Sequence, residues 1–296
     1  MTTIGIDIGG TKMCICAGPP DHRVFSRFPT GAEITPQELE HMICGFVAKL
    51  ADPPNAIGIA VPGLVSDQKV IACDVLPNLV GWEPARIDIS CATISVMNDA
   101  DALASEVIKT SSPTDLSVVV AVGTGIGGSI INEGALIRGA SGGAGEIGWF
   151  PVIADGALVR LDDVAGGAAL LKKIGGDVDE IGRRLKSDDR LATKAVTDAG
   201  RALGLAIGSL ICLLNPNRIV IVGGTLRYPG YLEAVMTAAK EGALPEAWEG
   251  CEIHVPEEGE TWPARGAAAT ATDGDLSQHS SAKQRIARTA GAESSD

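Results

Sequence analysis

Short apolar runs near the N-terminus, at residues 4–8 and 13–17, flank the glycine-rich sequence Gly9-Gly10-Thr11-Lys12. Two such runs around a glycine turn predict a β-hairpin. The same layout returns after the polar residues 111–114, with two strands and a glycine turn expected at residues 118–122, 129–132 and 123–128. Because the layout occurs twice, we expect an internal structural duplication.

The rest of the chain alternates helical and strand-like patterns, which indicates an α/β protein. Helices are expected at residues 35–50, 100–109, 193–214 and 266–271. Buried strands are expected at residues 56–61, 94–97 and 219–222. These elements predict an N-terminal domain over residues 1–112, a larger C-terminal domain over 113–272 whose last helix returns to the first domain, and a polar tail over 273–296.

Composition and charge narrow the class of protein. The formal net charge of −13 provides no basic surface for nucleic acid or an anionic membrane. Hydrophobic residues make up 45% of the chain, which argues against global disorder. The sequence shows no uncharged apolar run of membrane-spanning length and no leader pattern at its start. The seven cysteines include no CxxC pair. We therefore expect a cytoplasmic protein with free thiols.

The 37 glycines outnumber the 10 aromatic residues (4 Trp, 4 Phe and 2 Tyr), so the function of the glycine turns matters. Gly123-x-Gly125-x-x-Gly128 matches the dinucleotide-binding fingerprint, but that motif must open a helix, and here a strand is expected. The turns are either simple tight turns or nests of backbone N–H groups for phosphate. Asp7 favours the phosphate site, because a carboxylate in an apolar strand is costly without a partner such as Mg²⁺.

Several motifs between Ile4 and about Ala271 resemble, in order and spacing, those of the ROK family of sugar kinases and repressors. They are Asp7-Ile8-Gly9-Gly10-Thr11-Lys12, Asn98-Asp99-Ala100 with Glu106, Gly123-Thr124-Gly125-Ile126-Gly127-Gly128, Gly145-Glu146-Ile147-Gly148 and residues 219–224. The resemblance implies a two-lobed actin-like ATPase (ribonuclease H-like) fold, with duplicated βββαβα-type domains around a cleft. It also implies transfer of the γ-phosphate of ATP to a sugar hydroxyl. Repressors of the family carry an N-terminal helix-turn-helix, whereas this sequence begins at the first strand, so we expect the kinase branch.

The resemblance also assigns roles to the polar residues after the expected strands. Asp99 matches the family's catalytic base, which takes the proton of the attacking hydroxyl; without the resemblance, a helix N-cap would be the favoured role. Asn98 matches a sugar-hydroxyl ligand. Glu146 matches a carboxylate that binds sugar hydroxyls, its alternative being a surface glutamate. Gly63 would let the sugar approach the backbone, and Asn78 matches a segment that lines the cleft.

ATP and Mg²⁺ are the cofactors that the resemblance implies, with the nucleotide held between the two glycine hairpins. Asp7 would hold the metal, directly or through water. The residues expected to contact the nucleotide are Asp7, Gly9, Gly10, Thr11, Lys12, Gly123, Thr124, Gly125, Gly127, Gly223 and Gly224. Backbone amides and Mg²⁺ would then account for polyanion binding by an acidic chain.

The sequence departs from the family pattern around Glu146. Trp149 stands where family kinases usually have a histidine that binds zinc and sugar, and residues 150–159 contain no cysteine for the expected zinc loop. We therefore expect no zinc site. Asp162 aligns with a second sugar-binding glutamate and is one methylene shorter. Trp149 could stack on a sugar face or could fill the space of the missing loop.

These departures leave the substrate open. We expect phosphorylation of a hexose, of an amino sugar such as kanosamine or N-acetylmannosamine, or of a sugar-like cyclitol. The expected acceptor is the primary 6-hydroxyl. The alternative is a catalytically silent sugar-binding regulator on the same fold. Expected partners are the small-molecule substrate and a second copy of the chain in a homodimer or homotetramer, with no nucleic acid or membrane.

Overall fold

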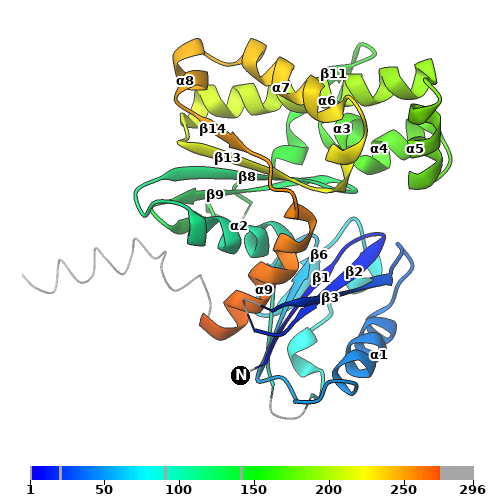
Figure 1. The fold of residues 1–296 in the computed structure, drawn as a ribbon, viewed down its shortest axis with the longest axis vertical. Helices are drawn as coiled ribbons and strands as arrows, with labels where there is room; N and C mark the ends of the chain where they lie inside the picture. Colours follow the sequence, from blue (N-terminus) through cyan, green and yellow to red (C-terminus); the bar gives the residue numbers. More distant parts are fainter. Residues whose placement is uncertain (1, 20–21, 90–91, 141–142, 274–296) are drawn as a thin grey trace, which may run out of the picture.

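The computed structural model describes residues 2–19, 22–89, 92–140 and 143–273. These residues form two lobes, each built around a five-stranded sheet (Figure 1). The polar tail expected at 273–296 lies, apart from its first residue, outside the described residues.

The two sheets share one topology. The first has the order β3-β2-β1-β4-β7 and the second the order β10-β9-β8-β13-β14. In both, the first three strands along the chain are antiparallel neighbours and the last two are parallel to the central strand. The strands are β1 (Thr3–Ile8), β2 (Lys12–Ala17), β3 (Val24–Pro29), β4 (Ala56–Val61), β7 (Thr93–Asn98), β8 (Leu116–Val122), β9 (Ile126–Asn132), β10 (Ala135–Ile137), β13 (Arg218–Val222) and β14 (Glu252–His254). The duplicated, two-lobed α/β fold is thereby confirmed.

Helices cover both sheets, and two of them lie between the lobes (Figure 1). They are α1 (Pro36–Val47), α2 (Asp99–Thr110), α3 (Asp162–Ala165), α4 (Gly167–Ile174), α5 (Val178–Lys186), α6 (Arg190–Leu214), α7 (Tyr231–Gly242), α8 (Pro245–Glu249) and α9 (Trp262–Asp273). Helix α9 packs on β1 and β4 of the first sheet and on α2, which itself contacts β8 and β9 of the second. Two small hairpins, β5–β6 (Leu64–Ser66, Lys69–Ala72) and β11–β12 (Pro151–Ala154, Ala157–Arg160), complete the lobes.

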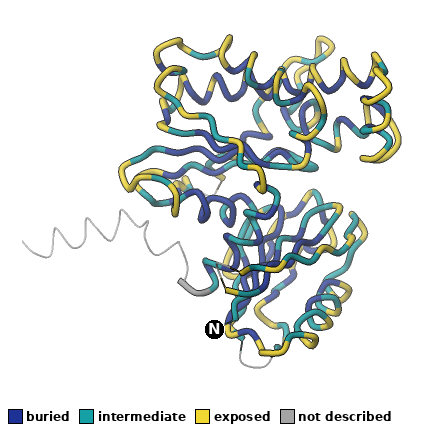
Figure 2. Tube along the Cα trace, viewed as in Figure 1, coloured by how far each residue is buried: buried dark blue, intermediate teal, exposed yellow. Residues whose placement is uncertain are grey.

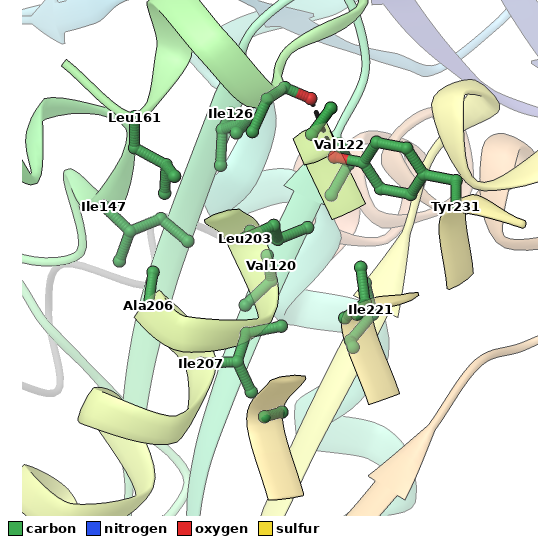
Figure 3. Close-up of a cluster of buried hydrophobic side chains, with 14 of the residues drawn as sticks. Val120, Val122, Ile126, Ile147, Leu161, Leu203, Ala206, Ile207, Ile221 and Tyr231 are labelled. Carbon is green, nitrogen blue, oxygen red and sulfur yellow. Dashed lines mark hydrogen bonds between the residues drawn. The ribbon is translucent and has the colours of Figure 1, made fainter. Parts of the chain in front are cut away.

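Helix α6 forms the centre of the second lobe's core. Leu203 and Ile207 of α6 pack against Val120 of β8, and the Tyr231 hydroxyl of α7 donates a 2.7 Å hydrogen bond to the Ala165 carbonyl (Figure 3). By length and composition α6 could cross a membrane, but 56% of its most apolar stretch is buried in the protein. Burial of this kind is typical of a core helix.

Alternation along β1 explains the carboxylate in its apolar run. Ile4, Ile6 and Ile8 point into the buried core of the first lobe. Gly5 points the opposite way, against α9, and Asp7 lies on the same side of the strand as Gly5. Figure 2 shows that most of this sheet is buried, with α9 on one side and α1 on the other. Asp7 therefore faces the region between the lobes.

The second glycine turn is shorter than the sequence indicates. A strand was expected from Ser129, but β9 begins at Ile126, so Gly127 and Gly128 pair with β8 rather than lying in the turn. Glycine is needed there because a Cβ on Gly128 would lie 2.9 Å from the carbonyl oxygen of Gly145. The continuing strand confirms that this GxGxxG sequence opens no helix.

Candidate active site

The predicted site residues follow the carboxyl ends of parallel strands, where open α/β sheets bind ligands. Asp99 follows β7, Gly63 lies two residues beyond β4, and Gly223 follows β13. The tips of the two hairpins also meet here, since a Cβ on Gly10 would lie 3.4 Å from the Thr124 hydroxyl. The fold therefore brings together residues that are up to 213 positions apart.

Asn98 is the N-cap of α2. Its Oδ1 accepts hydrogen bonds from the backbone N–H groups of Ala100 (2.8 Å) and Asp101 (3.3 Å), and its Nδ2 donates to the Gly63 carbonyl (2.7 Å). Gly63 needs its positive φ of 99°, and a Cβ there would lie 2.2 Å from the Ala72 carbonyl oxygen. Capping is thus done by Asn98, and Asp99 is not required for it.

Asp99 begins α2 with a perturbed carboxyl group. One oxygen, Oδ1, accepts from the Ala100 N–H at 2.8 Å, which leaves Oδ2 for a ligand. Burial raises the pKa of Asp99 to about 6; the Ala100 N–H opposes this, and the charges of Asp101 and Glu146 reinforce it. A carboxylate with a pKa near neutrality is suited to accept a proton in catalysis.

The raised pKa of Asp99 predicts the acid limb of the pH profile. A general base works only when deprotonated, so kcat should fall about tenfold per pH unit below pH 6, rather than below the ordinary value near 4. The measurement is kcat from pH 4.5 to 8 at saturating substrates, with circular dichroism to confirm folding at each pH. A rate that stays constant down to pH 5 would contradict the assignment.

Asp7 is the second buried carboxyl group in the cleft. Burial raises its pKa to about 7, with a further increase from Asp99 and an opposing effect of Lys12. Among the described residues, none donates a hydrogen bond to the Asp7 carboxylate. Desolvation of the Asp7 carboxylate is therefore not offset by a hydrogen bond. This is expected of a residue that binds a cation when ligands are present.

The second hairpin is packed against β13. The Thr225 hydroxyl donates to the Gly123 carbonyl at 2.9 Å, and Gly223, with a φ of 130°, would place a Cβ 2.1 Å from the Val122 carbonyl oxygen. Beside Gly223 a cavity of about 210 Å³ extends along η4 (Gly224–Arg227) to η5 (Gly259–Thr261). Of the expected nucleotide residues, Gly223 thus borders this cavity.

Lys12 is engaged in an ion pair at the border of this cavity. Its Nζ lies 3.2 Å from the Glu260 carboxylate, which also pairs with Arg27 (2.9 Å) and Arg227 (3.1 Å). Burial alone would raise the pKa of Glu260, but hydrogen bonds and charges from Lys12 and Arg227 outweigh it and lower the pKa. Sequence reasoning missed Glu260, because 248 residues separate it from Lys12.

Glu146 and Asp162 lie close together beyond the second hairpin. Asp162 Oδ1 accepts from the Ile126 N–H at 2.5 Å, and its carboxyl group would be 2.9 Å from a Cβ on Gly148. Partial desolvation of the Glu146 carboxyl group raises its pKa, and the negative charges of Asp162 and Asp101 raise it further. Glu146 is exposed, and no hydrogen bond or ion pair within the described chain occupies its carboxylate. Glu146 is thus available to a ligand, whereas Asp162 also supports the hairpin.

Trp149 ends η3 (Ile147–Trp149), directly after Glu146, and is 58% exposed. The guanidinium of Arg160 lies 4.7 Å from the indole centroid, and Arg160 also pairs with Asp163 at 3.1 Å. A side chain this exposed does not fill interior space, and the substrate contact of Trp149 stays a prediction. Asn78, on η1 (Pro77–Leu79), is exposed and donates to the Glu33 carbonyl at 3.0 Å.

Comparison with known proteins identifies relatives of this chain. The N-acetylmannosamine kinase of Shigella boydii serotype 18 is 29% identical over 255 residues, which are 80% of this chain and 88% of the relative. The ROK glucokinase of Streptomyces griseus, solved with glucose and AMPPNP, superposes with a TM-score of 0.78 at 23% identity, over 93% of this chain and 100% of that chain. The ROK hexokinase of Thermus thermophilus gives 0.71 at 25% identity, over 92% and 98%.

The fold and these relatives place the chain among the sugar kinases, which are phosphotransferases with the actin-like ATPase fold. The family model of the ROK family matches residues 3–273, and the chain belongs to this family.

Proposed function

We propose that this protein transfers the γ-phosphate of ATP to a hydroxyl, most directly the primary 6-hydroxyl, of a hexose, an amino or N-acetylated hexose, or a sugar-like cyclitol. The observation that carries the proposal is the Asp99 carboxylate, which stands at the start of α2 with one oxygen free and a raised pKa. Relatives named N-acetylmannosamine kinase support an N-acetylated amino sugar within this class. The expected setting is the cytoplasm.

In the proposed mechanism, Asp99 Oδ2 accepts the proton of the sugar hydroxyl as its oxygen attacks the γ-phosphorus. The Ala100 N–H fixes Oδ1, and the Asn98 cap fixes the start of α2, so the carboxylate is preorganised. Glu146 accepts hydrogen bonds from sugar hydroxyls on the other side of the cleft. The Gly9 and Gly123 N–H groups donate to the Lys12 and Gly125 carbonyls, so the proposed phosphate donors are the neighbouring N–H groups at the hairpin tips, such as that of Gly10.

The residues present fit a magnesium ion at Asp7. Mg²⁺ prefers oxygen ligands and is bound in kinases by one or two carboxylates, waters and substrate phosphates. Asp7 supplies one carboxylate to which no described residue donates a hydrogen bond. A nearby cation would stabilise its charged form against the burial that raises its pKa to about 7. When bound, the ion would offset negative charge on the phosphates.

The test is ADP release with MgATP against a panel of glucose, mannose, N-acetylmannosamine, N-acetylglucosamine, kanosamine and a cyclitol. We expect one of them to give sugar-dependent ADP release that EDTA abolishes and excess Mg²⁺ restores. Sugar-dependent thermal stabilisation without phosphate transfer from any nucleotide or polyphosphate would instead indicate a silent sugar-binding regulator. The same samples can be weighed by analytical ultracentrifugation to test for a homodimer or homotetramer.

A further inference from the structure

Arg138 connects the loop that carries Glu146 to the helix that carries Asp99. Its Nη1 lies 2.6 Å from Oδ2 of Asp101, in the first turn of α2. Among residues 138–140 and 143–146, which the structure describes, Arg138 is the residue that forms an ion pair with α2. Asp101 is 20% exposed and Arg138 is 37% exposed, so the pair is partly shielded from water.

The backbone of Arg138 also closes the base of this loop. Its carbonyl accepts a 3.2 Å hydrogen bond from the Ala144 N–H, after a turn at Gly139 with a φ of 70°. At the other end of the loop, Gly145 packs on β9, where a Cβ would lie 2.5 Å from the Gly128 carbonyl oxygen. Glu146 follows at once. Arg138 therefore contacts Ala144 through its backbone carbonyl and Asp101 of α2 through its side chain.

The Arg138–Asp101 ion pair is surrounded by further carboxylates. The carboxylate of Asp101 acts on both Asp99 and Glu146, whose pKa values it raises. Asp101 lies in the first turn of α2, where the helix dipole favours a carboxylate. The other charged groups facing Asp99 and Glu146 are carboxylates: Asp7 from β1 and Asp162 from α3. Arg138 is thus placed to offset repulsion between α2 and the loop.

We propose that Arg138 is a positioning residue for the sugar substrate: by pairing with Asp101 it holds the Glu146 loop against the start of α2, at the distance from Asp99 that the sugar must span. This inference rests on the proposed sugar-kinase function. It adds a residue that does not touch the sugar and acts through Asp101 and Glu146.

The alternative is a surface ion pair with little effect, which is the usual outcome for exposed pairs. Two observations argue against it. The 2.6 Å separation and the low exposure of Asp101 make this a short, charge-assisted hydrogen bond. The pair also joins two segments that each carry a proposed sugar-site carboxylate, so even a small shift would change their separation.

The experiment compares the parent with Arg138→Met, Arg138→Lys, Asp101→Asn and the double variant Arg138→Met/Asp101→Asn, using the best sugar from the panel. Arg138→Met should raise the KM for the sugar about tenfold and leave the KM for ATP within about twofold, since only the sugar side is displaced. Arg138→Lys should recover most of the loss. The double variant should bind sugar better than Arg138→Met, because the unpaired carboxylate is gone.

Arg201→Met is the matched control, because Arg201 pairs with Glu241 between α6 and α7 at 2.9 Å, outside the cleft. It should keep both KM values. A sugar KM within twofold of the parent in Arg138→Met overturns the inference, as does an equal rise in both KM values. A double variant no better than the single one excludes the charge-balance role. A parent that phosphorylates no sugar refutes the proposed function instead, and calorimetric titration of sugar into parent and Arg138→Met then still tests the positioning role.

Discussion

Asp99→Asn is expected to lower kcat about 10³-fold, within the range that general bases contribute, while sugar and ATP still bind. Asparagine keeps an oxygen to accept from the Ala100 N–H, so the local structure should survive. It cannot take the proton of the attacking hydroxyl, and it removes the group whose pKa is raised to about 6. The measurement is single-turnover phosphate transfer together with the KM values for both substrates.

The control for this substitution is Asp52→Asn, which makes the same change at an exposed position in the loop after α1. It should leave kcat unchanged. The Asp99→Asn variant should also lose the acid limb near pH 6, because the titrating base is absent. Retention of more than about a tenth of the parental kcat would show that another group takes the proton.

The strands and hairpins of the site could be predicted because their signals are local. The strand at residues 56–61 matches β4 at both ends, and the expected helix over 35–50 contains α1. Its start is fixed by a capping box, in which the Thr35 hydroxyl and the Glu38 carboxylate each accept a backbone hydrogen bond. Apolar period and capping residues lie within a few positions of one another, so a single sequence reveals them.

Elements that depend on distant contacts escaped prediction. The start of β9 at Ile126 was missed because glycine weakens a strand pattern, and the reason for glycine at 128 is the approach of Gly145. Likewise α9 begins at Trp262, four residues before the expected start at Gly266. No local pattern shows which backbone will pack on which.

The same difference between local signals and distant contacts applies to the candidate site. Asp99 and Glu146 could be assigned because each stands in a short motif. The ion pair of Lys12 with Glu260 and that of Arg138 with Asp101 join separate segments. The sequence suggested a nucleotide contact for Lys12 but gave no sign of its pairing with Glu260. Which charged residues pair across the fold depends on the topology, whereas the composition gives only the net charge.

Close packing of α9 on the first sheet and on α2 accounts for three of the glycines. Gly5 of β1 and Gly58 of β4 are direct neighbours in the sheet, and α9 lies over both. A Cβ on Gly58 would be 1.9 Å from the Ala267 carbonyl oxygen, and one on Gly266 of α9 would be 1.7 Å from the Ala102 carbonyl oxygen of α2. The backbone of α9 therefore touches the sheet and α2 directly.

Gly58→Ala is accordingly expected to destabilise the protein by about 3 kcal/mol, the upper part of the range for overpacked cores. The added methyl group meets a backbone oxygen, which cannot rotate away, so α9 must move off β1 and β4. In a chain of this size the loss should lower Tm by roughly 6–12 °C. Because α9 also packs on α2, the start of α2 and with it Asp99 should be displaced, and kcat should fall even at temperatures where the variant is folded.

Gly45→Ala provides the opposite control within the same lobe. Gly45 lies in α1 on an exposed position, and a Cβ there would meet nothing within 4 Å. Alanine is favoured over glycine in a helix interior, so this variant should be more stable by about 0.5–1 kcal/mol. Urea unfolding of the two variants beside the parent measures both effects. Equal stability of Gly58→Ala and the parent would mean that α9 is not seated on the glycines of the sheet, and the lobes would then have to be joined by other contacts.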